Sequence, residues 1–354
     1  MRLPRVKPEH APHRFGDGTI RLGGVLYGIA SEITDDDGCA WAVLNLMDGT
    51  RSPAEIAETL HSAFSAVLTR AEAVEIVDTL IASGHVEEAA PGPCAELSPR
   101  EKDRYSRSKD YFRWVDLHPR DSGWEPQVRL KQARVLVLGL GGTGSHAAWS
   151  LAASGVGRLH LVDPDVVELS NLNRQLLYTE ADVGRSKADV ALARLREVNS
   201  DIEITAASAT VDGPADLTRL VRGFDVLALC ADRPREPDGI QSWANAVCAK
   251  AGIPWVSGGY NGPLVSVGVF GPGGPCFACV RAGIPPRPGA DYAWPGVTGA
   301  TAGLSGQLVA YDVVSLVTGL ATTPPGYFHG VTLLDPDGHV YARHPARPDC
   351  EICS

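Results

Sequence analysis

The stretch Val135-Leu-Val-Leu-Gly139-Leu-Gly141-Gly142-Thr143-Gly144-Ser145 decides the fold. Its apolar first half is typical of a buried parallel strand, and the residues after the glycines favour a helix. Gly139, Gly141 and Gly144 form a G-x-G-x-x-G pattern, a tight turn that lets backbone N–H groups approach a phosphate at the positive end of the helix dipole. Alone the pattern is a weak signal, because a dinucleotide site or a plain strand-to-helix turn carries it too.

Length, charge and hydropathy narrow the class of protein. The 354 residues are enough for two domains. The net charge of −10 argues against a nucleic-acid-binding protein, because no basic excess is available to neutralise phosphates. No apolar run approaches the length of a membrane span, and residues 1–18 contain no apolar signal region. We therefore expect a cytoplasmic protein that binds neither nucleic acid nor membrane.

The first hundred residues predict a small domain of their own. Residues 1–12 are expected to form a flexible leader, and residues 91–100 a linker. Between them we predict two short strands and a turn in 19–30, helices in 40–47, from the capping box at 52–55 onward and in 70–83, and a last strand from His85. The third helix is predicted to bury Val74, Val77, Leu80 and Ile81. This order is typical of a winged-helix domain over residues 13–90.

Winged helices commonly bind DNA, but the charge of this region opposes that function. Residues 1–97 carry seven Lys and Arg against fifteen Asp and Glu, a net charge of −8. A region of that sign would repel the DNA backbone. Two interpretations stay open: a structural or dimerisation appendage, and a module that captures an extended peptide along a free strand edge.

From residue 134 the pattern alternates between strands and helices. Strands are predicted at 135–138, 158–162, 202–206, 224–229 and 254–257, with helices at 184–199 and 241–251. The alternation predicts an α/β fold with a doubly wound parallel sheet. An antiparallel strand at 264–270, a long helix at 299–320 and a terminal hairpin at 331–343 complete the sheet. The long helix is not expected to span a membrane, because Gln307 and Asp312 interrupt it.

Polar residues follow the predicted strands. Asp163 lies nineteen residues beyond Gly144, as a ribose-binding carboxylate in an NAD site should. NAD does not need the residues that come next, which are Asn171, Arg174, Gln175 and Lys187. A triphosphate that releases pyrophosphate does need cations, and Asp232 is placed to hold Mg²⁺. Singly these could be turn residues, surface charges or a helix cap, but together with the glycine turn they favour a triphosphate.

These motifs resemble the ubiquitin-activating-enzyme-like superfamily of adenylyltransferases, of the ThiF and MoeB type. The resemblance covers residues 101–354, with matching order and spacing. Its motifs are Gly139–Ser145, Asp163-Pro-Asp165, Ser170-Asn-Leu-Asn-Arg-Gln175, Gly184-Arg-Ser-Lys187 and Cys350-Glu-Ile-Cys353. The resemblance implies a Rossmann-like mixed sheet and the adenylation of a carboxylate by ATP, which gives acyl-AMP and pyrophosphate.

Residue roles follow from the same resemblance. It implies that ATP is bound by Gly141, Gly142, Gly144, Asp163, Asp165, Asn171, Arg174, Gln175 and Lys187, and that Asp232 holds Mg²⁺. Arg107, Arg174, Lys187 and Asp232 would then be catalytic. Arg107 matches an arginine that reaches into the partner subunit's ATP site, which implies a homodimer. Two positions depart from the family: Arg233 stands where asparagine is usual, and Ser108 where glutamine is usual.

Cysteines form two C-x-x-C pairs, Cys276 with Cys279 and Cys350 with Cys353. Four thiolates in this pattern predict a structural tetrahedral zinc site, and disulfides are the alternative. No cysteine lies between Cys279 and Cys350, the region in which related enzymes carry a cysteine for a thioester or persulfide. We therefore predict that no thioester forms on the enzyme.

Residues 13–90 resemble the PqqD-like precursor-recognition domain of ribosomal peptide biosynthesis. The resemblance rests on Tyr27-Gly-Ile-Ala30, Leu46-Met-Asp-Gly-Thr-Arg-Ser52 and Gly84-His-Val86. Together, the two resemblances imply an enzyme of microcin-type or pantocin-type maturation, which adenylates a carboxylate of a precursor peptide for attack by an amide, amine or sulfur nucleophile. The alternatives are an activator of a ubiquitin-like sulfur-carrier protein, an NAD-dependent oxidoreductase and an inactive leader-binding scaffold.

Overall fold

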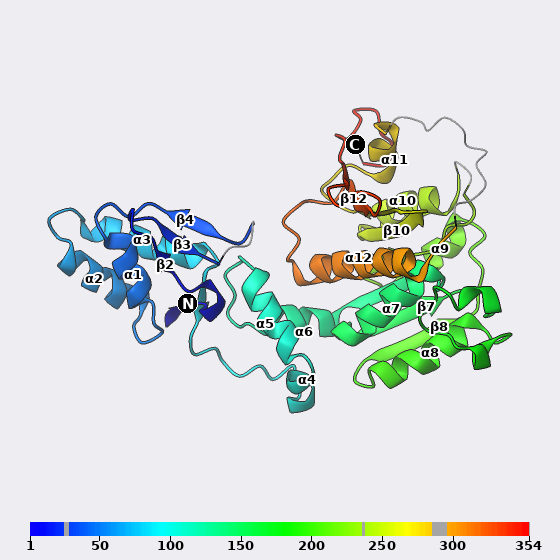
Figure 1. Cartoon of the computed structure of the whole chain (residues 1–354), viewed down its shortest axis with the longest axis horizontal. Helices are drawn as coiled ribbons and strands as arrows, with labels where there is room; N and C mark the ends of the chain where they lie inside the picture. The colour runs from blue at the N-terminus through cyan, green and yellow to red at the C-terminus, as the bar shows by residue number, and fades with distance from the viewer. Residues whose placement is uncertain (25–27, 236–237, 285–295, 354) are drawn as a thin grey trace. The chain divides into compact units, whose positions relative to one another are not determined.

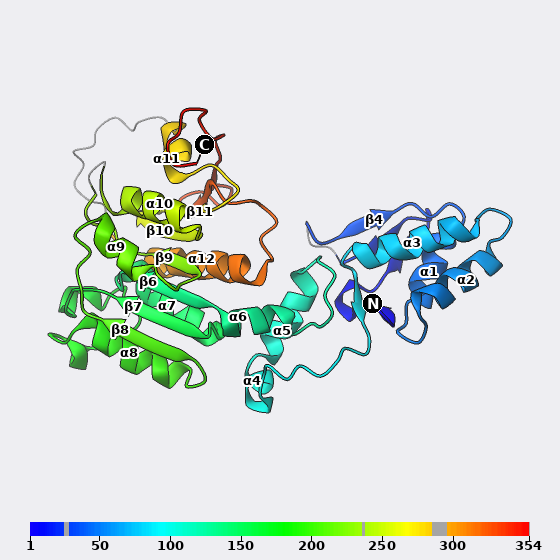
Figure 2. The same cartoon turned by 180° about the vertical axis from the view of Figure 1, so that it is seen from behind.

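The computed structural model describes residues 1–24, 28–235, 238–284 and 296–353 (Figures 1 and 2). The chain divides into two compact units, Met1–Val128 and Arg129–Ser354. Each unit buries an apolar core of its own, built around Ile20, Val43 and Ile56 in the first and around Leu136, Leu227 and Trp255 in the second. Burial of such side chains supplies the main driving force for folding in each unit.

Two small antiparallel sheets form in the first unit. Strand β1 (Pro4–Val6) pairs with β5 (Val86–Glu88). A second sheet has the order β2 (His13–Arg14), β3 (Ile20–Leu22) and β4 (Ser31–Ile33). Residues 4–6 therefore belong to a sheet, which corrects the expected flexible leader, because Arg2 and Leu3 donate backbone N–H groups to the Glu88 carboxylate and Val6 pairs with Val86. Tyr27 of the predicted recognition motif lies outside the described residues.

Three helices occur where the sequence predicts them: α1 (Cys39–Leu46), α2 (Pro53–Ala63) and α3 (Arg70–Ala82). Capping boxes start the second and third, with Ser52 and Glu55 on α2 and with Thr69 and Glu72 on α3. One predicted core residue is wrong, because Val74 is exposed and Ala73 takes the inward position with Val77 and Leu80. Three further helices follow: α4 (Pro99–Arg104), α5 (Ser106–Val115) and α6 (Glu125–Gln132). The winged-helix assignment stays a prediction.

A mixed eight-stranded sheet forms the second unit, in the order β13-β12-β11-β10-β9-β6-β7-β8. Its parallel strands are β6 (Arg134–Leu138), β7 (Arg158–Val162), β8 (Glu203–Ala207), β9 (Val226–Leu229) and β10 (Trp255–Asn261). The antiparallel strands are β11 (Leu264–Phe270), β12 (Tyr327–Thr332) and β13 (His339–Ala342). This confirms the predicted α/β mixed sheet and its terminal hairpin. The strand order reverses at β6, with β7 added on one side of it and β9 on the other, and open α/β sheets bind ligands at such a switch point.

Helices cover the sheet in two groups (Figures 1 and 2). One holds α7 (Gly142–Ser154), α8 (Lys187–Val198) and α12 (Gly299–Thr318), and the other α9 (Pro214–Leu220), α10 (Ile240–Ala251) and α11 (Phe277–Ala282). Leu136 and Leu138 of β6 share a core with α9 and α10, so the alternate residues of β6 face the other group.

Within the part of the chain that the structure describes, α12 alone is long and apolar enough to cross a membrane, by length and composition. Half of that apolar window is buried inside the structure, where α12 packs on α7 and on β10. Asp312 is buried in this helix and accepts a hydrogen bond from His329 Nε2 of β12 at 2.7 Å. These contacts show that α12 packs against other elements of the second unit.

Candidate active site and candidate metal centre

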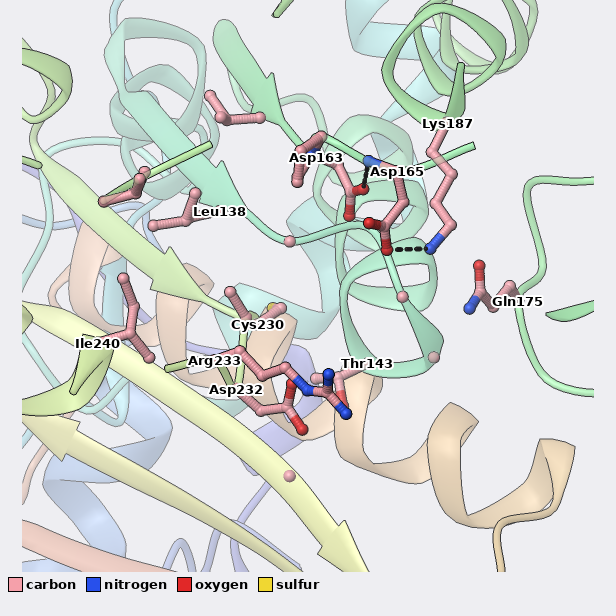
Figure 3. Close-up of a pocket in the computed structure, with 18 of the residues that line it drawn as sticks. Leu138, Thr143, Asp163, Asp165, Gln175, Lys187, Cys230, Asp232, Arg233 and Ile240 are labelled. Carbon is pink, nitrogen blue, oxygen red and sulfur yellow. Dashed lines mark hydrogen bonds and ion pairs between the residues drawn. The ribbon is translucent and has the colours of Figure 1, made fainter. Parts of the chain in front are cut away.

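A cavity of about 1180 Å³ opens at the carboxyl ends of the central strands (Figure 3). It is larger than the ~300–1,000 Å³ of ordinary ligand pockets, so it has room for a nucleotide and part of a second molecule. The cavity brings together nine predicted site residues: Gly141, Gly142, Asp163, Asp165, Asn171, Arg174, Gln175, Lys187 and Asp232. They come from segments far apart in sequence, because the parallel strands all end at this edge.

The glycine turn shapes one wall of the cavity. Gly139 has φ +92°, and a Cβ there would lie 2.5 Å from the backbone nitrogen of Ala231. Helix α7 begins directly behind it, and its N-cap residue Gly141 makes no side-chain cap hydrogen bond. The first N–H groups of α7 therefore fit an anion. Gly144 is placed differently: its Cβ would lie 1.9 Å from the carbonyl oxygen of Gly139, so it permits close packing of helix on turn rather than lining the cavity.

Asp163 directly follows β7 and is a buried carboxylate. The backbone N–H groups of Leu140 and Asp165 donate hydrogen bonds to its two oxygens, at 2.6 Å and 2.9 Å. Burial raises the pKa of Asp163, while the Leu140 N–H and the nearby Lys187 oppose that rise. The carboxylate is thus fixed in orientation, and each oxygen keeps a lone pair that can accept a ribose hydroxyl.

Lys187 and Gln175 lie on the same side of the cavity as Asp163 and Asp165 (Figure 3). Lys187 opens α8, and its nearly buried Nζ lies 2.9 Å from Asp165 Oδ2. Arg174 donates hydrogen bonds to acceptors of its own loop, the Ser170 carbonyl and Asn173 Oδ1. Gln175 is buried, yet its Oε1 has no hydrogen-bond partner among the described residues. A buried acceptor without a partner costs free energy until a ligand donor satisfies it, which fits a nucleotide here.

Four cysteines converge at the other end of the unit. Cys276 and Cys279 flank the start of α11, and the Sγ atoms of all four lie within 4.8 Å of one another. Cys276 Sγ is 3.6 Å from Cys350 Sγ, and Cys279 Sγ is 3.7 Å from Cys353 Sγ. Disulfide sulfurs would lie about 2 Å apart, whereas thiolates at ~2.3 Å around tetrahedral zinc lie nearly 4 Å apart. The cluster therefore fits a closed structural zinc site, with Arg347 N–H donating to Cys279 Sγ.

Comparison with known proteins identifies the family. Residues 116–352 match the model of the ThiF family. The chain belongs to the ThiF family. Adenylyltransferase and sulfurtransferase MOCS3 of Mus musculus is 40% identical to this ThiF-family chain over 270 residues, which are 74% of this chain and 54% of the mouse protein. The chain thus spans about half the length of the curated relatives that it matches.

Solved structures share the fold of this ThiF-family chain. E. coli MccB matches with a TM-score of 0.79 at 22% identity, covering 99% of this chain and 97% of that one. PaaA matches with a TM-score of 0.66 at 25% identity, covering 96% and 100%. MccB has been solved with ATP, and as the microcin C7 biosynthetic enzyme in complex with N-formylated MccA. At this identity the MccB likeness establishes the fold alone.

For two predicted site residues of the ThiF-family chain, Asp232 and Arg107, the structure supports the predicted role less directly. Asp232 lines the cavity but is exposed and forms an ion pair with Arg235. Its single carboxylate could share a Mg²⁺ with ATP phosphates, provided that the ion displaces Arg235. Arg107 is exposed on α5 of the first unit, and its role in a partner's site stays a prediction.

Two side chains were not foreseen from the sequence: Arg235, which lines the cavity, and Tyr178, which contacts the glycine turn beside it. Arg235 gave no motif signal, being only two residues beyond the unusual Arg233. Tyr178 is buried and donates its hydroxyl hydrogen to the carbonyl of Leu140, which holds the glycine turn. In the sequence, the one indication of a role for Tyr178 was its position three residues after the predicted site residue Gln175.

Proposed function

We propose that this protein is an ATP-dependent adenylyltransferase that activates a carboxylate of a ribosomally made precursor peptide during the maturation of a peptide natural product. The observation that supports it most is the cavity itself. There an uncapped helix start, the buried Asp163 and the unpartnered Gln175 Oε1 surround a space large enough for ATP and an acyl group. We place the reaction in the cytoplasm.

Each side chain then has a defined task. The N–H groups at the start of α7 bind phosphate oxygens, and Asp163 accepts hydrogen bonds from the ribose. A carboxylate oxygen of the peptide attacks the α-phosphorus, and the bond from that phosphorus to the bridging oxygen breaks. Arg174 and Lys187 stabilise the charge on the departing pyrophosphate. Mg²⁺ held by Asp232 would supply further charge neutralisation when bound.

Peptide recognition is assigned to the first unit. Strand β4 lies at one edge of the sheet β2-β3-β4, with β3 as its partner among the described strands. An extended peptide can add to such an edge through main-chain hydrogen bonds. The complex of MccB with N-formylated MccA supports this proposal. In the same proposal the enzyme is a homodimer, and Arg107 completes the partner subunit's site.

The fate of the adenylate follows from the cysteines. The sequence has none between Cys279 and Cys350. The acyl group is therefore not passed to an enzyme thioester, and an amide, amine or sulfur nucleophile attacks the adenylate directly. The cysteine cluster would hold zinc in a structural role.

A second candidate is activation of the C-terminus of a ubiquitin-like sulfur-carrier protein. The 40% identity to a protein named adenylyltransferase and sulfurtransferase favours it. Both candidates share the ATP chemistry and differ in the acyl substrate. The acyl substrate that supports turnover therefore distinguishes the two candidate functions.

The decisive experiment is ATP–pyrophosphate exchange with purified full-length protein. Peptides encoded beside the gene and a purified sulfur-carrier protein are tested separately, and products are identified by mass spectrometry. Exchange with a peptide supports the proposal. Exchange with the sulfur carrier alone replaces it with the second candidate, and binding of NAD without binding of ATP refutes both.

A further inference from the structure

Four arginine and lysine side chains line the cavity, and three of them already have partners. The engaged ones are Lys187 with Asp165, Arg235 with Asp232, and Arg174 with Ser170 and Asn173. Arg233 differs from these three, because within residues 1–24, 28–235, 238–284 and 296–353 its side chain forms no hydrogen bond and no ion pair. Among the described residues that line the cavity, Arg233 is therefore a cation that can accept an anionic ligand without breaking an existing contact.

The loop after β9 places Arg233 opposite the start of α7. This loop packs tightly against the glycine turn, as the 2.5 Å approach of a Gly139 Cβ to Ala231 N shows. Figure 3 shows the Arg233 side chain extending into the cavity from beside Asp232, with its guanidinium toward Thr143 in the first turn of α7. The free guanidinium and the helix N–H groups thus face the same space.

Adenylation brings two anions together in that space. A carboxylate must approach an α-phosphate that is itself negative, and two like charges in contact repel more strongly near a protein surface than in water. The N–H groups of α7 offset charge on the phosphate side only. A guanidinium matches a carboxylate with two parallel hydrogen bonds, and it stays charged at every physiological pH. The amide of an asparagine at position 233 would supply no charge.

We propose that Arg233 binds the substrate carboxylate and holds it against the α-phosphate of ATP. This assignment rests on the proposed adenylation and specifies it further. Arg233 is then a specificity residue that selects a free carboxylate over its amide, while Arg174 and Lys187 act on the leaving pyrophosphate. The substrate oxygen that attacks phosphorus keeps its negative charge until the P–O bond forms, and Arg233 moves no proton.

The test uses the full chain saturated with the ATP analogue AMPCPP, so that turnover is not required. Acetate and acetamide serve as probes, and saturation-transfer NMR reports their binding. The wild type is expected to give transfer to acetate and none to acetamide. Arg233→Ala should lose the acetate signal, and Arg233→Lys should keep part of it. Arg222→Ala is the matched control, because Arg222 is exposed and does not line the cavity. AMPCPP affinity should stay the same in all variants.

Kinetics provide the second readout. With a peptide that supports pyrophosphate exchange, Arg233→Ala should raise the KM for that peptide on the order of tenfold or more while the KM for ATP is unchanged. Acetate transfer that survives in Arg233→Ala, absence of transfer in the wild type, or a rise in the KM for ATP alone would overturn the assignment. Acetate binding through Arg233 with no exchange on any peptide would instead refute the proposed peptide substrate and leave the carboxylate site standing.

Discussion

Lys187 occupies the first position of α8 with its side chain nearly buried and its Nζ 2.9 Å from Asp165. In the proposed reaction this ammonium stabilises charge that develops on pyrophosphate. Lys187→Ala is expected to lower the exchange rate by about 10²–10³-fold, the range seen when one charge-stabilising donor is lost. Peptide binding, measured by titration, should be retained. The exposed Lys250 of α10 gives a control, and exchange at the wild-type rate in Lys187→Ala would contradict the phosphate role.

Gly142 is enclosed at the first residue of α7. A Cβ there would lie 2.7 Å from the Tyr260 hydroxyl and 3.0 Å from Ala302 Cβ. Gly142→Ala is therefore expected to lower stability by about 1–3 kcal/mol and to weaken AMPCPP binding, measured by thermal unfolding and by titration. Tyr260→Phe should restore part of the loss, because it removes the nearest atom. Gly213→Ala serves as the control, since nothing lies within 4 Å of its Cβ. Wild-type stability of Gly142→Ala would show that Tyr260 and Ala302 move to make room for the added methyl group.

At the scale of elements, the cysteine cluster ties α11 to residues 350–353. We expect one zinc per chain, measured by metal analysis of purified protein. Removing the zinc by chelation, or replacing Cys350 with serine, should lower the melting temperature, because the site links segments 74 residues apart in sequence. Cys94→Ser should leave the melting temperature unchanged, since Cys94 lies outside the cluster. Equal melting temperatures with and without metal would refute a structural site.

The strands of the second unit could be predicted from the sequence to within a few residues, because each is an apolar run of ordinary strand length. Two short helices of this unit, α9 and α11, could not be predicted from the sequence. The six-residue α11 begins between two metal-pattern cysteines, and the seven-residue α9 follows Gly213-Pro214, so neither is long enough to show helical periodicity. Val74 was wrongly predicted to be buried. Helix α3 has several apolar residues, so two neighbouring faces of the helix are similarly apolar in the sequence, and in the structure the face with Ala73 is buried where α3 packs against α2.

At the scale of the molecule, nine of the predicted site residues meet in one cavity, as expected from the parallel sheet that the sequence predicts. The strand order brings the ends of β6, β7 and β9 together, and with them Gly141, Asp163 and Asp232. The pairing of Asp232 with Arg235 could not be predicted, since it depends on the path of a loop without periodicity. The unsatisfied oxygen of Gln175 likewise follows from three-dimensional burial, which no local pattern records.

Stability of the first unit should depend on pH through two buried histidines. His10 Nδ1 and His85 Nδ1 lie 2.9 Å apart, so at least one ring must be neutral. Burial lowers the pKa of both, that of His85 to about 4, with nearby His10 and Lys7 adding to the effect on His85. Other charges around the pair are Glu9, Glu87, Arg113 and Asp116.

The lowered pKa values determine the direction in which the stability of the first unit changes with pH. The unfolded chain takes up protons near pH 6.5 while the folded pair does not, so the stability contributed by the neutral histidines is present above pH 6.5 and is lost as pH falls toward 4. Each histidine should contribute a slope of up to about 1.4 kcal/mol per pH unit in this window. Denaturant unfolding at pH 7.5 and 5 tests it. His85→Gln should flatten the dependence, His13→Gln should not, and an unchanged slope in His85→Gln would contradict the assignment.

Helix α12 packs closely on α7, so nucleotide binding at the start of α7 should also affect α12. Gly306 has no room for a side chain, because its Cβ would lie 2.5 Å from the Thr143 carbonyl oxygen and from His146 Cβ, and Thr143 Oγ1 lies 3.0 Å from Ser305 Oγ. The two helices are therefore in direct contact, although no residue of 299–318 lines the described cavity. Amide protons along α12 should exchange more slowly once AMPCPP immobilises the first turn of α7, which makes α12 a remote reporter of occupancy.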